Sequence, residues 1–190
     1  DNTPAVGMEQ PGGYGKSFHT KLHDPCKVRA SVWDDGVTRA AGVGIDALLI
    51  RRETVEAVRR GIRERCGIPE THILIGASHS HSSGPVGMIL PGEFDHASPQ
   101  VQDLAYKQSS TADPKYLALV EKQLIDAVCA ADAVRQPAAV GVGKGIEDQV
   151  AFNRRFRMKN GLTATHPRQG NPDIVEPAGP TDPEVGVMGA

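Results

Sequence analysis

The chain has 190 residues, of which 39% are hydrophobic and 23% are charged, and this is the ordinary composition of one folded domain with an extended tail. Its 21 lysine and arginine residues nearly balance 23 aspartate and glutamate residues, and the net charge of −2 gives no reason to expect nucleic acid or an anionic membrane as a partner. No apolar run approaches the ~20 residues of a membrane-spanning helix, so no transmembrane segment is predicted.

The first part of the chain predicts an arm followed by two strands. Residues 1–25 are polar and rich in glycine and proline, which indicates a loosely ordered arm. Residues 28–32 alternate apolar and polar side chains, as a strand does, and the sequence Asp-Asp-Gly at 34–36 is typical of a hairpin turn. The stretch AAGVGIDALLI, residues 40–50, is largely apolar, which predicts a strand covered on both faces.

A βαβ unit is the next prediction. Apolar residues recur at helical spacing at Val55, Val58, Ile62 and Cys66. Gly67 is placed to end this helix, and residues 72–78 (HILIGAS) form a short buried strand. His79 and His81 then lie just beyond the carboxyl end of the second strand, which is where open α/β sheets bind their ligands.

The remainder of the chain is less regular. Residues 84–112 form a long irregular stretch, which is uncommon unless functional. Asp113, followed by proline, predicts a helix start, and the helix has one apolar face. That face consists of Leu117, Val120, Leu124 and Val128. Residues 138–146 and 148–156 predict two further strands, paired as a hairpin that turns near Glu147.

The last segment begins at Leu162 and contains five prolines, which exclude a helix or a central strand. We expect an extended segment that lies over a partner surface or a disordered tail, with the start of another strand where valine and glycine alternate at its tip. The predicted fold class is therefore α/β, with a mixed β-sheet, a βαβ unit, packed helices and extended proline-rich terminal arms. The predicted ranges are an arm at 1–26, an α/β domain at 27–161 and a proline-rich segment at 162–190.

The two histidines at 79 and 81 are the strongest candidates for chemistry. Residues i and i+2 of an extended backbone point to the same side, so His79 and His81 are expected to face one crevice. Neutral imidazole is a common zinc ligand, but a catalytic zinc site uses about three protein ligands and a water. Two histidines do not complete such a site, and the alternative is a polar loop whose side chains satisfy local backbone groups.

The neighbouring serines do not indicate a nucleophile. Ser80, Ser82 and Ser83 lack the Gly-x-Ser-x-Gly elbow of α/β-hydrolases, and adjacency in sequence does not place a base beside them. We expect these serines to form a turn and a polar lining.

A basic segment is the second candidate. Between residues 151 and 170 there is no acid, and the cations are Arg154, Arg155, Arg157, Lys159 and Arg168. Guanidinium groups suit carboxylates or phosphates. Arg157 and Lys159 lie at a Lys-Asn-Gly turn signal and are expected on a solvated hairpin face, whereas Asn153 and Arg154 are the better functional candidates.

One carboxylate and three cysteines complete the set of candidates. Asp46 lies in an apolar stretch and needs a partner, which is either a histidine that it orients or a local backbone amide. The cysteines, Cys26, Cys66 and Cys129, are widely spaced and form no Cys-x-x-Cys pair. We expect them to be small buried hydrophobic residues rather than zinc ligands or disulfide partners.

The five other histidines are weaker candidates. His19, His23 and His72 are expected to be structural or to lie on the surface. His96 and His166 are candidates for a third metal ligand.

The stretch ILIGASHSHSSGPVG, residues 73–87, resembles the amino-terminal domain of the neutral/alkaline non-lysosomal ceramidase family, in which a strand is followed by residues like His-Thr-His-Ser-Gly-Pro. It is preceded by GVGIDALLI and a helix, as in that family, and FNRRF at 152–156 is similar to the family's Asn-Arg-Ser-Pro segment. The resemblance covers roughly residues 27 to 157.

The resemblance implies zinc-dependent amide hydrolysis. His79 matches the family's first zinc (Zn²⁺) ligand, and His81 matches a histidine that faces the substrate, as a proton shuttle or a hydrogen-bond donor. Arg154 matches an arginine that lines the active site. The implied substrate is an N-acyl or other amide, lipid-like or, given the arginines, anionic, and the implied location is secreted or periplasmic.

The departures from the family are specific. Ser80 stands where the family has threonine, Ser83 is an extra residue, and Arg155 replaces a serine. The family's second zinc histidine, its acidic and tyrosine ligands and its catalytic serine have no match here. This indicates a piece of a larger protein, which we favour, or a relative without the chemistry. The expected partners besides an amide substrate are then the remaining part of the same protein or a homo-oligomer.

Two alternatives remain open from the sequence. One is a different metal-dependent hydrolase, of the amidohydrolase type, with further ligands at the ends of later strands. The other is a non-catalytic structural or assembly protein on the same fold, whose proline-rich arms at 1–25 and 162–190 clasp neighbours.

Overall fold

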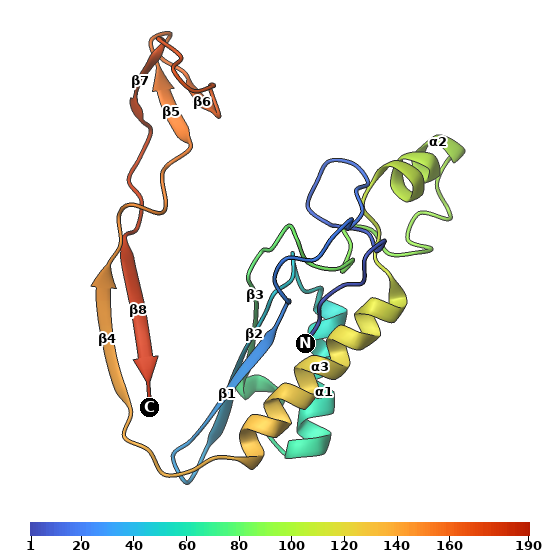
Figure 1. The fold of residues 1–190 in the computed structure, drawn as a ribbon, viewed down its shortest axis with the longest axis vertical. Coiled ribbons are helices and arrows are strands. Elements are labelled where there is room, and N and C mark those ends of the chain that lie inside the picture. Colours follow the sequence, from blue (N-terminus) through green and yellow to red (C-terminus); the bar gives the residue numbers. More distant parts are fainter. The chain divides into compact units, whose positions relative to one another are not determined.

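A computed structural model describes residues 1–190, and they form two compact units, which we describe separately. Unit 1 comprises Asp1–Arg135, and unit 2 comprises Gln136–Ala190. The α/β class predicted from the sequence is confirmed, with helices and mixed sheets both present (Figure 1). The units divide the chain at a different place from the predicted ranges, because residues 136–161 group with the tail. No helix has the length and apolar character to cross a membrane.

Unit 1 is built on a three-stranded sheet in the order β1-β2-β3. Its strands are β1 (Val28–Asp34), β2 (Arg39–Ile45) and β3 (Ile73–Ala77). The predicted hairpin between β1 and β2 is confirmed, and its turn is held by a bond from the Gly36 backbone N–H to Asp34 Oδ1 (2.9 Å). β3 lies parallel to β2, with Ala41 opposite Ile73. The predicted βαβ unit is therefore confirmed.

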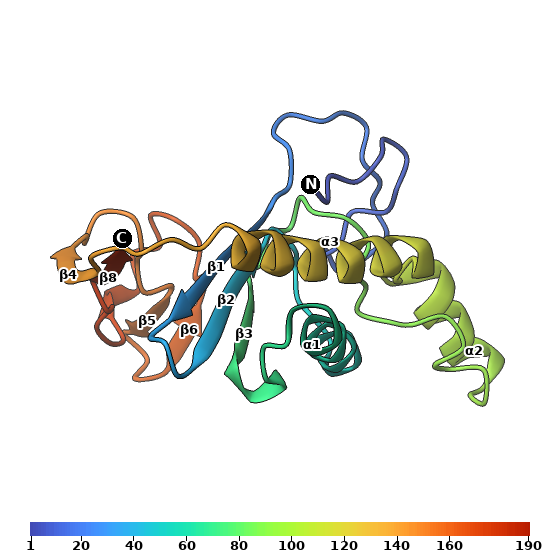
Figure 2. The same cartoon turned by 90° about the horizontal axis from the view of Figure 1, so that it is seen from below.

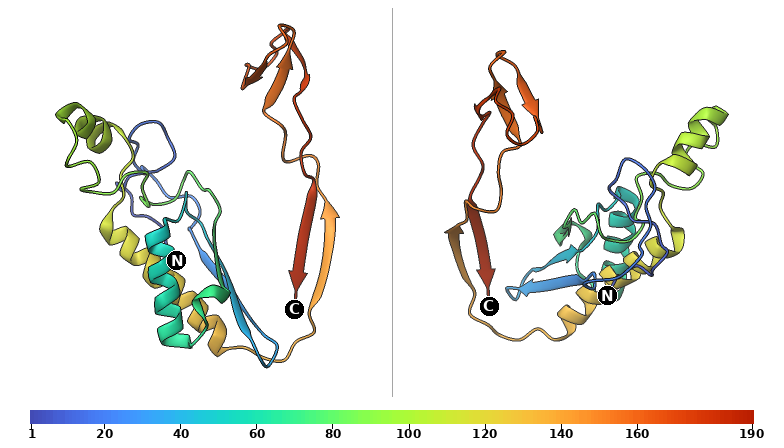
Figure 3. Two further views of the ribbon diagram at one scale, coloured as in Figure 1. Left: turned by 180° about the vertical axis from the view of Figure 1, so that it is seen from behind. Right: turned by 45° about the horizontal axis from the view of Figure 1, so that its top comes forward.

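Two helices pack on one face of this sheet (Figures 2 and 3). α1 (Arg52–Cys66) ends at Gly67, whose φ of 72° is left-handed, as the sequence predicted for its C-cap. α3 (Pro114–Ala133) begins at Asp113, whose carboxylate accepts from the Lys115 backbone N–H (2.7 Å). The side chains of Val58, Ile62, Val120, Leu124 and Val128 are fully buried between the helices and the sheet.

The opposite face of the sheet is not covered within unit 1, so the prediction that the apolar stretch at 40–50 is covered on both faces is wrong. The outward positions of β2 are occupied by Gly42 and Gly44, and a Cβ at either would meet no atom within 4 Å. Leu74 of β3 is 73% exposed on that face. The apolar run misled the prediction because glycine counts as apolar but presents no side chain.

Residues 1–25 are folded back onto unit 1, so the prediction of a loosely ordered arm is also wrong. Asn2, Pro4, Pro11 and His19 are buried. The arm pairs with itself, through bonds from the Gly7 N–H to the His19 carbonyl (2.8 Å) and from the His19 N–H to the Met8 carbonyl (2.9 Å). Its backbone groups are satisfied by its own turns, which a composition argument does not detect.

The stretch at 84–112, predicted to be irregular, contains helical turns. They are α2 (Pro99–Gln102) and a π-helical segment, η2 (Asp103–Gln108). Ser98 caps α2 and proline follows it, which is a start signal that the prediction overlooked.

Cys66 and Cys129 form a disulfide that joins α1 to α3, with their Cα atoms 5.7 Å apart. The prediction that both are buried hydrophobic residues is wrong, because 63 positions separate them in sequence and only the packing of the two helices brings them together. Cys26 is free and buried, as predicted.

Unit 2 contains a two-stranded ribbon and a three-stranded sheet. The ribbon pairs β4 (Gly141–Ile146) with β8 (Glu184–Gly189), and the sheet has the order β6-β5-β7. Its strands are β5 (Arg155–Met158), β6 (Thr163–Thr165) and β7 (Ile174–Pro177).

The predicted hairpin at Glu147 is wrong, because the partner of β4 is the last strand of the chain. The segment from Leu162 contains three strands, β6, β7 and β8, so the alternative of a disordered tail is wrong, and the strand predicted at the tip of this segment is confirmed as β8. The Lys-Asn-Gly signal does form a turn, between β5 and β6, with Gly161 at a φ of 81°.

Candidate functional site

The candidate site is the loop that follows β3. Pairing between the two parallel strands continues past their ends, because the Ser78 N–H donates to the Ile45 carbonyl and the Ser80 N–H to the Ala47 carbonyl, both at 3.0 Å. These two bonds fix the backbone on either side of His79. The loop is therefore held against the segment that follows β2, and the position of His79 is set by both.

His79 is oriented by a backbone carbonyl. Its Nδ1 lies 2.9 Å from the carbonyl oxygen of Leu48. Because a carbonyl only accepts, Nδ1 carries the proton and Nε2 of the neutral ring is left with a free lone pair. This is the arrangement in which a metal-ligating histidine is commonly held by its surroundings.

The backbone of His79 is in the left-handed region, with a φ of 59°. For a residue other than glycine this conformation costs about 1–2 kcal/mol. Such conformations are found mainly where the surrounding structure imposes them, often at functional sites. The backbone strain and the hydrogen bond to Leu48 therefore both indicate His79 as a candidate functional residue.

His81 lies beside His79, although His79 is left-handed and lacks the extended backbone from which the i, i+2 spacing predicted a common crevice. The two ring centroids are 5.0 Å apart and the rings are nearly perpendicular, at 77°. The His81 carbonyl accepts a hydrogen bond from Gln10 Nε2 (2.9 Å), and its ring lies against Gly12 of the arm. Both imidazoles are exposed.

The serines alternate with the histidines and contact a different space. Ser80 and Ser82 line a cavity of about 480 Å³, and neither His79 nor His81 lines it. The cavity is otherwise formed mostly by residues of the arm, with Asp46 and Cys26 in its wall. Ser83 is fully buried, and its hydroxyl donates to the Ser80 carbonyl (3.0 Å). The serines thus form a turn and a polar lining, as expected.

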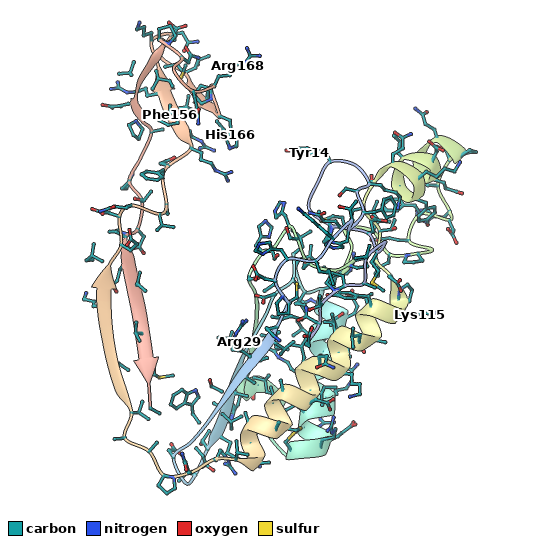
Figure 4. The ribbon with its side chains drawn as sticks, in the orientation of Figure 1. Tyr14, Arg29, Lys115, Phe156, His166 and Arg168 are labelled. Carbon is teal, nitrogen blue, oxygen red and sulfur yellow. A yellow bond between two sulfur atoms is a disulfide. The ribbon has the colours of Figure 1, made fainter.

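Asp46 caps a backbone amide, which was one of the two alternatives open from the sequence. Its Oδ2 accepts from the Lys27 backbone N–H (2.9 Å) and from the guanidinium of Arg29 (3.3 Å), a residue labelled in Figure 4. The Lys27 amide and the Arg29 charge hold the pKa of the Asp46 carboxyl below its usual value. It is the Leu48 carbonyl, rather than this carboxylate, that orients His79.

Cys26 is unsuited to hold a metal as it stands. Burial raises the pKa of its thiol, and the nearby Asp46 carboxylate raises it further. Because the thiolate is the form that binds a metal, the neutral thiol is a poor ligand here.

Two other histidines of unit 1 bond to backbone carbonyls elsewhere. His19 is buried and its Nε2 donates to the Ser83 carbonyl (2.9 Å), and His72 lies at the opposite end of β3 with Nδ1 on the Arg39 carbonyl (3.1 Å). The two third-ligand candidates are exposed, His96 before α2 and His166 in unit 2. No group of three or more His, Cys, Asp or Glu side chains in the chain is arranged to hold a metal ion.

The arginine candidate Arg154 belongs to unit 2 and is exposed. Its carbonyl accepts from the His166 backbone N–H (3.1 Å), so these two residues are opposite each other where β5 begins and β6 ends. Figure 4 labels His166 and Arg168, which are separated by one proline in sequence. Arg154 forms no salt bridge within the chain, so its guanidinium is available to an external group.

Two further predictions for the basic segment can be compared with the structure. Asn153 is used structurally, because its amide donates to the Gly179 carbonyl (2.9 Å) and accepts from the Arg155 N–H (3.0 Å). Arg157 is exposed, as expected, but is paired with Glu176 on β7 (2.6 Å). The sequence did not indicate this acid because it lies 19 positions away.

Sequence analysis missed two residues of the site, Gln10 and Gly12. The glycine-rich arm was noted as a composition signal, but its contact with His81 spans about 70 positions and depends on the arm folding back. A comparison of the chain with protein-family models, curated proteins and solved structures gives no match.

Proposed function

We propose that this chain is part of a zinc-dependent amide hydrolase similar to the neutral ceramidases, with His79 as a zinc ligand through Nε2. The observation that carries the proposal is the hydrogen bond from His79 Nδ1 to the Leu48 carbonyl, because it leaves Nε2 free and fixes the direction of the ring. Zinc at such a site supplies a Lewis acid and an activated nucleophile for attack on an amide carbonyl.

The donor set of this chain fits part of a zinc site. His79 provides one oriented imidazole, and a catalytic zinc uses about three protein ligands. The further ligands and any protein nucleophile would come from residues outside the 190 described here or from another copy of the chain.

His81 and Arg154 would act on the substrate. The His81 imidazole, next to His79, would carry a proton or donate a hydrogen bond at the reacting amide. Arg154, which has no acidic partner in the chain, would bind a carbonyl or an anionic group of an N-acyl substrate, lipid-like or more polar. The Cys66–Cys129 disulfide supports a secreted or periplasmic location, because disulfides persist in oxidising compartments.

A zinc titration of the chain with two matched variants tests the proposal. In H79A the oriented nitrogen is lost, and we expect the zinc affinity to fall by about tenfold or more. H72A is the control, because His72 is also held through Nδ1 by a backbone carbonyl but has no second imidazole beside it. Equal affinities in the wild type, H79A and H72A would contradict the proposal.

A non-catalytic assembly role is the second candidate, and the β4–β8 ribbon favours it. The ribbon exposes apolar side chains, with Val142 82%, Ile146 69% and Val187 60% exposed. A two-stranded ribbon is marginally stable alone and usually needs covering. If the chain assembles through it, light scattering should show oligomers in which V142K reduces the mass, and purified protein should contain no stoichiometric zinc.

The remaining alternative is another metal-dependent hydrolase, of the amidohydrolase type. The zinc titration of H79A has the same expected result under this alternative, which in addition predicts a second set of ligands at the ends of later strands. His166, directly after β6 in unit 2, is a histidine that such a second set would use, so H166A should then lower the zinc affinity of that set.

A further inference from the structure

The arm carries a turn that is anchored on both sides. Glu9 and Phe18 form a β-bridge, and the Gln10 N–H donates to the Ser17 carbonyl (2.8 Å). Glu9 is mostly buried, where its carboxylate pairs with Lys16 (2.8 Å) and accepts from the Thr111 backbone N–H (2.7 Å). The turn between these anchors is therefore fixed to the body of unit 1.

From this turn two residues reach the loop after β3. Gln10 Nε2 donates to the His81 carbonyl (2.9 Å), which ties the arm to the backbone of that histidine. Gly12 lies directly against the imidazole, because a Cβ on Gly12 would be 2.5 Å from His81 Nδ1 and 2.6 Å from its Cγ. Real Cβ atoms do not approach other atoms so closely, so no side chain is tolerated at this position while the ring stays where it is.

We propose that Gly12, held in place through Gln10, is a positioning residue for the His81 imidazole. Gly12 has a φ of 98°, which glycine adopts without strain, so its backbone can lie flat against the ring. The contact covers the side of the ring that carries Nδ1. Nδ1 is therefore the ring nitrogen of His81 that lies against the arm.

In both His79 and His81 the contacted ring atom is Nδ1, but a different part of the chain makes each contact. His79 has Nδ1 on the Leu48 carbonyl, and His81 has Nδ1 against the Gly12 backbone. The two rings meet edge to face. The arm is therefore part of the candidate site, because it contacts one of its two imidazoles. Its role in catalysis rests on the proposed function, whereas the contact itself does not.

A spectroscopic comparison of two glycine variants tests the contact. Gly7 also has a left-handed backbone, with a φ of 89°, but a Cβ on Gly7 would meet no atom within 4 Å. G12A and G7A therefore both place alanine at a positive φ, and only G12A introduces a clash with His81. In ¹⁵N-histidine spectra, assigned with H79A and H81A, we expect G12A to shift the His81 ring signals and G7A to leave them unchanged.

A double-mutant cycle provides a second test. In an H81A background the clashing ring is gone, so the G12A loss of urea midpoint should shrink to that of G7A. Should G12A not fold, Q10A is the milder variant, and it should also shift the His81 signals while leaving those of His72 unchanged. The proposal is overturned if the G12A loss is unaffected by H81A, or if neither G12A nor Q10A moves the His81 signals.

Measurements of zinc affinity and amide turnover distinguish the positioning role of Gly12 from zinc binding by His79. Since His81 is not the ligand in the proposed function, G12A should retain the zinc affinity that H79A loses. In the complete source protein, amide turnover should fall by about 10²-fold in kcat with little change in KM, because the ring is displaced rather than removed. A normal kcat in G12A would refute the positioning role. If zinc binding is lost on mutation of other residues but not in H79A, only the proposed function is refuted.

Discussion

His79 and His81 meet edge to face beyond the carboxyl end of β3, with ring centroids 5.0 Å apart and planes at 77°. Three separate segments hold the pair. The loop carries both rings, the segment after β2 supplies the Leu48 carbonyl, and the arm supplies Gly12. The pair is therefore a tertiary arrangement, although its two members are almost adjacent in sequence.

The left-handed backbone of His79 predicts an unusual stability order among its variants. H79G should be more stable to urea than H79A, by about 1 kcal/mol, because both lack the ring but only alanine retains the strain. The control is A77G in β3, where the backbone is extended and glycine should destabilise the protein. An H79G variant no more stable than H79A would show that the strain is not present.

Asp46 predicts a loss of stability in acid. Its pKa is lowered in the folded state, mainly by the Lys27 N–H, so the unfolded state binds the proton more readily. The stabilisation is therefore present above the unfolded pKa, which is about 3.9 for aspartate, and is lost as the pH falls through the lower folded pKa. The free energy of unfolding should differ between the wild type and D46N at pH 7, and this difference should shrink progressively below about pH 4.

Arg29→Gln provides the comparison for this effect. It removes the guanidinium but leaves the Lys27 amide, which is the larger cause of the shift, so it should reduce the pH dependence less than D46N does. Equal pH profiles for the wild type and D46N would mean that Asp46 makes no such contribution.

Local signals in the sequence were sufficient for the elements that surround the site. Gly67 ends α1, Asp113 begins α3, and the hairpin turn follows β1, each through chemistry confined to a few neighbouring residues. The spacing of His79 and His81 does not belong with these features, because the i, i+2 rule assumes an extended backbone and His79 is left-handed. The caps and the hairpin turn were predicted correctly because they depend on a few neighbouring residues.

Features set by distant contacts could not be predicted. β4 and β8 pair across about 40 positions, and the sequence instead favoured the nearer partner at 148–156. Cys66 finds Cys129 only through the packing of α1 on α3. The contact of Gly12 with His81 has the same origin, since composition indicated a flexible arm and only the folded backbone shows why a glycine is needed there.

The disulfide predicts a redox-dependent stability. Replacing both partners, as C66S/C129S, should lower the free energy of unfolding by about 2–4 kcal/mol, because the open chain gains conformational freedom when it unfolds. Dithiothreitol should lower the urea midpoint of the wild type to that of the double variant and should leave the variant unchanged. Cys26→Ala is the control, since Cys26 is free, and it should remain sensitive to the reductant. A wild-type midpoint that dithiothreitol does not alter would contradict the disulfide.

The hydrogen bond between Tyr116 of α3 and Asn2 predicts that a change in α3 loosens the arm. The Tyr116 hydroxyl is buried and donates to the Asn2 carbonyl (2.5 Å), and Asn2 Nδ2 donates to the Asp46 carbonyl (2.9 Å). Y116F removes the donor and leaves a buried acceptor unpaired, which should cost about 1–3 kcal/mol. Trypsin should then cut the arm after Lys21 faster than in the wild type. Tyr106→Phe is the matched control, because its hydroxyl bonds Asp95 on a surface loop, and cleavage at Lys21 should not change. If both variants left the cleavage rate at Lys21 unaltered, the arm would be held by contacts other than this hydrogen bond.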